Sequence, residues 1–336
     1  MFQSEFVFTI SINESEIITK IIFLKSRSHV ESIPYQYICA NMNRFKRLFS
    51  LTLALITLGA TAQTDDIKVS AEKFGFKRKG LLSMFWGWNR AFYTDSDIHF
   101  SGDNYNFTLL NVPGHDKQTQ LGIDPYLKLN SITIPQVNYG IGYFLTEKLE
   151  LTFRVDHMKY VMSNSVNVQM DGYIENSGTQ YDGVYDNEDF VLAYNFLSFE
   201  HTDGLNYINF GLNRHVPIWS AISGENGFWN LDMFGGGAAG ILFPKTNTRL
   251  MKFDRYDEFH LAGYGLDLHA GARIIYRRHY FIQVEGKSGF INMPDIRTTT
   301  SENDRASQYF FFAQGNVTFG AMIALGRAEK DSGKQK

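Results

Sequence analysis

A two-residue alternation of side chains in residues 132–162 constrains the fold of this chain more than any other feature. Large apolar residues occupy every second position on both sides of a short polar turn at residues 146–148. The apolar positions are Val137, Tyr139, Ile141, Tyr143 and Leu145 before the turn, and Leu149, Leu151, Phe153 and Val155 after it. Successive side chains of a strand point to opposite faces, so this period predicts two strands joined as a hairpin with one apolar face.

The other face of the predicted hairpin carries glycines, amides and charges. If Leu145 lies opposite Leu149, then Gly140 faces Arg154 and Asn138 faces Asp156. A soluble sheet presents its polar face to solvent, whereas long charged side chains opposite glycines fit a crowded, wet interior. The same pattern recurs in residues 262–276, 280–290 and 317–325.

Strand length and loop length extend this interpretation to the whole chain. The alternating segments reach about 10 residues or more, which matches a tilted membrane crossing. Short turns at 146–148, 202–204 and 277–279 alternate with long loops at 163–187 and 293–306, as in outer-membrane barrels. Aromatic residues expected near the strand ends, as in a membrane girdle, are Trp86, Trp88, Tyr93, Tyr276, Tyr280 and Tyr309.

These features predict an all-β fold, a transmembrane antiparallel up-and-down β-barrel with about 12 strands, 10 being the alternative. The expected crossings are 81–93, 104–112, 132–145, 149–162, 188–201, 205–216, 228–243, 260–276, 280–292 and 308–325, with 96–101 and 248–254 as two weaker candidates.

A second feature, an export signal, lies inside the chain. Arg44, Lys46 and Arg47 precede the apolar run 48–58, and the small residues 60–62 resemble a cleavage site. We therefore expect translation to start at Met42, with residues 1–41 a mis-called extension that contains the only cysteine, Cys39. The expected organisation is a signal peptide at 42–62, a periplasmic segment at 63–79, the barrel at 80–326 and a polar tail at 327–336.

The charge of the chain excludes one class of partner. It has 32 Lys and Arg against 35 Asp and Glu, a formal net charge of −3. A nucleic-acid-binding protein needs a basic face, so nucleic acid is not an expected partner.

The segments "WGWNRAFYTDSDIHFSGDNYNFTL" and "ITIPQVNYGIGYF" resemble an uncharacterised family of bacterial outer-membrane β-barrel proteins. The resemblance covers roughly residues 80–326 and brings no catalytic residues or cofactor with it. It implies contact with outer-membrane lipids, lipopolysaccharide and the barrel-assembly machinery, and leaves the oligomeric state open. One departure is the polar tail after Gly326, because many such barrels end on an aromatic residue.

Candidate chemical groups are sparse. Ser198, Glu200 and His201 lie together, and Asp97–His99 and Asp156–His157 are further acid–histidine pairs. Adjacent strand residues point to opposite faces, which separates Asp156 from His157 and Glu200 from His201. Acidic segments at 181–190 and 253–260 do not match the spacing of a calcium loop. We expect no metal and no cofactor, and favour a non-enzymatic role.

The charges on the predicted inner face form the candidate site. With Tyr276 opposite Tyr280, the pairs Arg273–Glu285 and Asp267–Lys287 become diagonal neighbours. The full predicted polar network of the lumen comprises Arg154, Asp156, Asp267, His269, Arg273, Glu285 and Lys287. It would either fill and stiffen the barrel or line a narrow solute passage, and filling is favoured because a small barrel has little internal room. The alternative function is a membrane-embedded enzyme that modifies phospholipid or lipid A.

Overall fold

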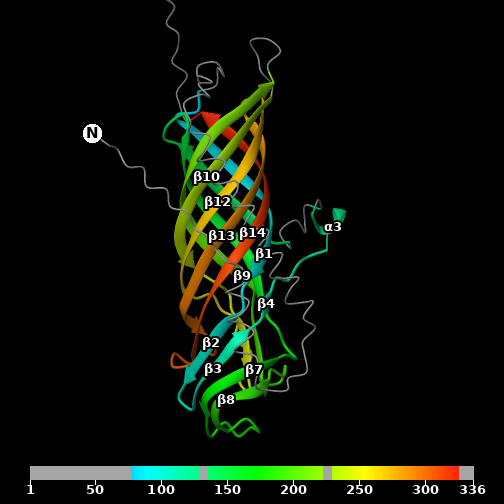
Figure 1. Ribbon diagram of the computed structural model, residues 1–336, viewed down its shortest axis with the longest axis vertical. Coiled ribbons are helices and arrows are strands. Elements are labelled where there is room, and N and C mark those ends of the chain that lie inside the picture. Colours follow the sequence, from blue (N-terminus) through cyan, green and yellow to red (C-terminus); the bar gives the residue numbers. More distant parts are fainter. Residues whose placement is uncertain (1–76, 121, 127, 129–134, 222–228, 325–336) are drawn as a thin grey trace, which may run out of the picture. The chain divides into compact units, whose positions relative to one another are not determined.

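The computed structural model describes residues 77–120, 122–126, 128, 135–221 and 229–324, which lie in the compact unit Phe45–Lys336 (Figure 1). The expected extension, signal peptide, most of the N-terminal segment and the polar tail lie outside the described residues. The described residues are mostly strand, with one helical turn, α3 (Ile123–Tyr126). No described helix has the length and apolar character needed to cross a membrane.

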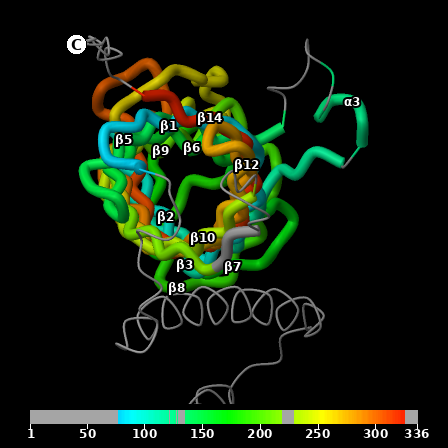
Figure 2. Tube along the Cα trace, turned by 90° about the horizontal axis from the view of Figure 1, so that it is seen from above, coloured from blue at the N-terminus to red at the C-terminus, as the bar shows by residue number. Residues whose placement is uncertain are grey.

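Eight of the described strands close into a ring. They are β1 (Leu81–Tyr93), β5 (Val137–Phe144), β6 (Leu149–Met162), β9 (Leu197–Ala221), β10 (Trp229–Leu242), β12 (Gly263–Tyr276), β13 (Tyr280–Arg297) and β14 (Arg305–Ala324). Each pairs antiparallel with the next, and β1 pairs with both β5 and β14, which completes the barrel (Figure 2). The all-β antiparallel barrel is therefore confirmed.

The expected strand number is wrong for the barrel itself. Six further described strands lie off the ring: β2 (Ser96–Gly102), β3 (Tyr105–Val112), β4 (Gly114–His115), β7 (Asn167–Ile174), β8 (Gly183–Val191) and β11 (Asn247–Leu250). Strands β2 and β3 alternate like membrane crossings, but the face that they bury packs on protein. Phe100 and Phe107, for example, are fully buried and stacked on each other. The two-residue alternation of apolar side chains does not by itself distinguish a strand that faces lipid from one that covers a protein core.

One predicted turn is also absent. Residues 202–204 were expected to separate two crossings, yet β9 runs through them without a break. Gly204 has a φ of +134°, and the pairing of β9 with β6 shifts register nearby, between Met158 and Tyr160. The polar residues Thr202-Asp203-Gly204 therefore mark an irregularity in a long strand and not a hairpin.

The strand registers agree with the sequence. Gly140 lies opposite Arg154 and Asn138 opposite Asp156 in the β5–β6 hairpin. In the β12–β13 hairpin, Gly271 lies opposite Glu285 and His269 opposite Lys287. Short turns at 146–148 and 277–279 define what we call the turn end of the barrel, and the opposite end is the loop end.

The outer face of the barrel is apolar. Large hydrophobic side chains from ring strands are exposed around it, among them Met84, Ile141, Leu151, Phe153, Phe210, Leu212, Leu266, Leu268, Ile282, Val284, Phe311, Val317 and Phe319. Tyr280 and Tyr309 of the expected aromatic girdle are also exposed. Tyr93 instead packs inside, edge-on against Tyr160 and Phe310.

The same sheet continues beyond the ring at the loop end. The first residues of β14, Arg305–Gln308, pair with β2, and the order then runs β3, β7, β8 (Figure 1). We call β2, β3, β7 and β8 the distal sheet. Its buried side chains and those of the loop end of the barrel form one large apolar cluster that includes Phe107, Tyr160, Phe199 and Phe310.

Candidate functional site: the polar lumen

The seven residues of the predicted network come from three ring strands and all are buried. Arg154 and Asp156 lie on β6, Asp267, His269 and Arg273 on β12, and Glu285 and Lys287 on β13. The most exposed of the seven is Asp267, at 5%. Their strand neighbours on the other face are lipid-type residues such as Phe153 and Val284, so the alternation of each strand aims the charges into the barrel.

The first group of contacts lies toward the turn end. The guanidinium of Arg154 donates two hydrogen bonds to Glu285, at 3.1 and 2.6 Å. Arg273 donates to Glu150 at 3.4 and 3.1 Å and to the amide oxygen of Gln283 at 2.9 Å. Arg273 and Glu285 are the diagonal neighbours expected from register, but they form no direct ion pair. Gln283 lies between them, accepting from Arg273 and donating to Glu285.

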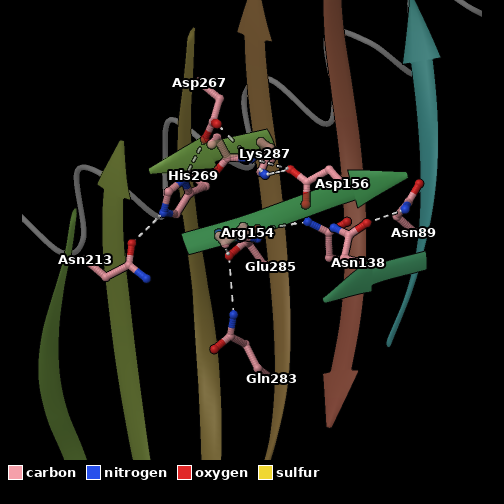
Figure 3. A network of polar contacts seen from close by, with 12 residues as sticks. Asn89, Asn138, Arg154, Asp156, Asn213, Asp267, His269, Gln283, Glu285 and Lys287 are labelled. Atoms are coloured by element: carbon pink, nitrogen blue, oxygen red, sulfur yellow. Dashed lines mark hydrogen bonds and ion pairs between the residues drawn. The ribbon is translucent and has the colours of Figure 1, made fainter. Parts of the chain in front are cut away.

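The second group lies toward the loop end, and Figure 3 shows its side chains beside Arg154 and Glu285. Lys287 donates to Asp156 and lies 3.9 Å from Asp267, which agrees with the diagonal Asp267–Lys287 pair expected from register. Asp267 in turn contacts Nδ1 of His269 at 2.6 Å, and Nε2 of His269 contacts the side chain of Asn213 at 2.6 Å.

Two ion pairs join strands that face each other across the lumen. In the ring order, β6 and β13 are four strands apart in either direction and therefore face each other across the barrel. Arg154–Glu285 and Asp156–Lys287 both join these two strands. Side chains from opposite walls meet only in a narrow barrel, and eight strands give an interior that side chains just fill.

Four further charged or titratable residues extend the network to the turn end. Glu150, His215 and Asp232 are buried, and His215 contacts Glu150 at 2.8 Å and Asp232 at 3.8 Å. Arg78, which precedes the first strand, reaches in to bind Asp232 at 2.6 Å. The two-residue alternation of their strands could have predicted that Glu150 and Asp232 point inward. The position of Arg78, which precedes the first strand, could not be predicted in this way.

The charges in this extended network nearly balance. Its fixed cations are Arg78, Arg154, Arg273 and Lys287, and its carboxylates are Glu150, Asp156, Asp232, Asp267 and Glu285. Two histidines, His215 and His269, each contact a carboxylate of this set. A buried charge is tolerated only when it is paired, so the arrangement accounts for every carboxylate of the set.

Apolar clusters pack against the network toward both ends of the barrel. Toward the turn end, Phe85, Phe144, Ile275, Phe281 and Met322 form a buried cluster. The Arg273 guanidinium lies 4.3 Å from the ring centre of Phe281 and 5.9 Å from that of Phe234. Toward the loop end, the large apolar cluster begins at Met158, Leu205, Tyr207 and Phe312.

Inner-face glycines make room for these side chains. A Cβ on Gly142 would lie 2.5 Å from a carboxylate oxygen of Glu150, and one on Gly320 would lie 2.2 Å from the ring of Phe281. Glycine at these positions therefore allows large side chains to fill the lumen.

The acid–histidine groups noted in the sequence have other partners. His201 contacts the hydroxyl of Thr246 at 2.9 Å, His99 that of Thr108 at 3.0 Å, and His157 the amide of Asn206 at 2.8 Å. Asp156 binds Lys287. Within the described residues, no cluster of three or more His, Cys, Asp or Glu side chains has the arrangement of a metal site.

Comparisons with known proteins add the following. No family model and no curated relative matches the chain. Outer membrane protein OprG from Pseudomonas aeruginosa is similar in structure, with 11% identity, a TM-score of 0.34 and coverage of 74% of this chain and 98% of that one. The attachment invasion locus protein Ail of Yersinia pestis is similar with 9% identity and a TM-score of 0.28, covering 73% of this chain and 99% of that one. Outer membrane protein AlkL has 8% identity and a TM-score of 0.35, covering 75% of this chain and 93% of that one. Likeness at this level transfers no activity.

The geometry alone defines the class of the fold. A closed antiparallel ring with an apolar exterior and a charged interior reverses the distribution of a soluble protein, and it is the arrangement of an outer-membrane β-barrel.

Proposed function

We propose that this protein is a structural barrel of the bacterial outer membrane that holds the distal sheet at the outer surface and conducts no solute. The apolar exterior of the ring supports insertion in a bilayer, with lipids and lipopolysaccharide around it and the barrel-assembly machinery needed for insertion. The short turns would face the periplasm and the distal sheet the outside, following the loop asymmetry of this class of barrel.

Burial of the lumen carries the proposal. Arg154, Glu150 and Arg273 are at most 1% exposed, and Asp156 and Lys287 are equally inaccessible. A water-filled channel would leave such side chains wetted along its length. Here they bond across the barrel instead, between two apolar clusters.

The enzymatic alternative has less support. A nucleophilic site needs a hydroxyl within reach of an imidazole that a third group orients. His99 and His201 each contact a Thr hydroxyl and His157 contacts an Asn amide. Among the described residues, however, no carboxylate forms an ion pair with any of these three imidazoles to orient it, and His201 is fully buried. The proposal therefore contains no catalytic step.

Conductance in planar lipid bilayers tests the closed lumen. We expect the purified protein, inserted in folded form, to give no stepwise current, while a general porin handled in parallel does. Folded insertion is checked by heat-modifiable migration on gels. A stable channel whose ion selectivity changes in Glu285→Gln or Lys287→Gln would refute the closed lumen and establish a pore lined by the network.

A further inference from the structure

Within the part of the chain that the structure describes, the distal sheet ends in a strand whose outer edge pairs with no other strand. In the order of the sheet, β8 is the last strand, and among the described strands only β7 pairs with it. Seven of its nine residues are exposed, the exceptions being the half-buried Tyr185 and Phe190. An edge strand presents unpaired N–H and C=O groups, so it can accept a further strand from another chain.

A groove runs along the β7–β8 hairpin beside this edge. It has a volume of about 850 Å³ and is lined by residues 171–176 and 182–186. Two apolar side chains on its walls face outward, Tyr173 at 40% and Val184 at 81% exposure. Gly172 has a φ of +123° and lies so close to β3 that a Cβ would come within 2.2 Å of the Asn106 carbonyl oxygen. The groove thus offers apolar contact next to a free backbone edge.

Charge limits what can occupy the groove. Four carboxylates belong to its lining, Asp171, Glu175, Asp182 and Asp186, and Glu188 and Asp189 follow on β8. Residues 160–213 contain no Lys or Arg. One cation from elsewhere, Lys252, lies at the turn of the β7–β8 hairpin, where its Nζ is 3.0 Å from the position of a Cβ on Gly178. A second copy pairing edge to edge would bring like charges together, which is unfavourable.

We propose that the β8 edge and its groove bind an extended, Lys- or Arg-bearing segment of a partner protein, which adds to the distal sheet as a further strand. Main-chain hydrogen bonds to β8 supply affinity, and alternate side chains of the segment reach the carboxylates and the apolar walls. The inference deepens the proposed function by naming the partner of the distal sheet. It rests on that function in one respect, that the distal sheet lies on the outer side of the membrane.

The test uses the full chain in nanodiscs and a fluorescent eight-residue peptide of alternating Lys and Val. Fluorescence polarisation should show saturable binding, after subtraction of empty nanodiscs, and no binding of the matching Glu–Val peptide. A Lys–Val peptide with N-methyl groups at alternate residues keeps the charge but loses backbone donors, and should bind at least tenfold more weakly. Equal binding of the methylated peptide would mean charge attraction alone and would overturn strand addition.

Matched variants locate the site. The double variant Asp171→Asn with Asp186→Asn removes two groove carboxylates that the lysines would contact. It should weaken Lys–Val binding about tenfold or more, a change of about 1.4 kcal/mol per tenfold. Asp254→Asn with Glu258→Gln removes two exposed acids from another loop and should leave binding unchanged. Asp182 is kept because it accepts a hydrogen bond from the Ser177 backbone in the hairpin turn.

Hydrogen exchange provides the second readout. Amides of β8 should exchange more slowly when the Lys–Val peptide is bound, because the added strand pairs with them. No binding of the Lys–Val peptide, equal losses in both variant pairs, or unchanged exchange at β8 would each overturn the inference. None of these results depends on conductance, so the proposal of a closed lumen and the proposal of strand addition at β8 are tested independently.

Discussion

At the scale of single residues, the lumen is built from charges that neutralise one another across the barrel. The Arg154–Glu285 pair has two hydrogen bonds and side chains at most 2% exposed. Asn316 also donates to Glu285 at 2.8 Å. Removing one partner of such a pair leaves the other charge buried without compensation, which is far more costly than removing both.

A double-mutant cycle on this pair is the first prediction. Arg154→Ala and Glu285→Ala should each lower the free energy of unfolding by about 3–5 kcal/mol. The double variant should lose less than the two single losses combined, by about 0.5–3 kcal/mol. Urea unfolding in lipid vesicles, followed by tryptophan fluorescence, measures each value. The same cycle on Arg273 and Glu285, which have no direct bond, is the control and should show weaker coupling.

The sequence was informative about which residues point inward and less so about their partners. Register within a hairpin follows from a short turn, so Gly271 opposite Glu285 was predictable. The Arg154–Glu285 contact joins residues 131 apart in the chain on facing walls. Predicting it requires the number of strands in the ring, and a barrel of 12 strands would have held these side chains too far apart.

At the scale of elements, each ring strand separates two environments by its alternation. On β6, Phe153 faces lipid, 37% exposed and 5.0 Å from the ring of Phe210, while its neighbours Thr152 and Arg154 are buried. Leu149, at the turn end of the same face, pairs with Arg214, which is exposed. The outer face of the strand therefore has a charged neighbour at the turn end, whereas the residues opposite Phe153 are the apolar Ile141 and Phe210.

Depth along β6 gives the second prediction. A crossing takes about 9–11 residues, so Phe153 lies near its middle and Leu149 at its edge. Phe153→Arg should lower stability by about 2–4 kcal/mol beyond the loss in Phe153→Ala, and Leu149→Arg by only about 0–1 kcal/mol. Folding yield and urea unfolding in vesicles measure both. Equal costs at the two positions would mean that this face does not cross a bilayer.

Element boundaries were the weaker part of the sequence analysis. Strands β2 and β3 carry the alternation of a membrane strand because they too have one buried face. What distinguishes them is length: they have 7 and 8 residues, against 13 to 25 in most ring strands. Strand β5, with 8 residues, belongs to the ring all the same, so length alone would not have assigned every strand.

At the scale of the whole molecule, one sheet serves two purposes. Its ring forms the barrel, and its continuation through β14 and β2 forms the distal sheet, with a shared apolar core at the loop end. Because Arg305–Gln308 of β14 pair with β2 and Phe312–Ala324 of the same strand pair with β1, backbone hydrogen bonds join the distal sheet to the barrel. A partner held at β8 would thus be fixed to the membrane protein through continuous strand pairing.

Surface labelling of single cysteines tests this orientation. Gln180 lies in the exposed turn of the β7–β8 hairpin, and Lys148 is exposed in the turn between β5 and β6. In a background with Cys39→Ser, Gln180→Cys should react on intact cells with a maleimide too large to cross the outer membrane. Lys148→Cys should react only after that membrane is permeabilised, since short turns face the periplasm in this class of barrel. The reverse pattern would place the distal sheet and its free edge inside the cell envelope, where an extracellular partner could not reach them.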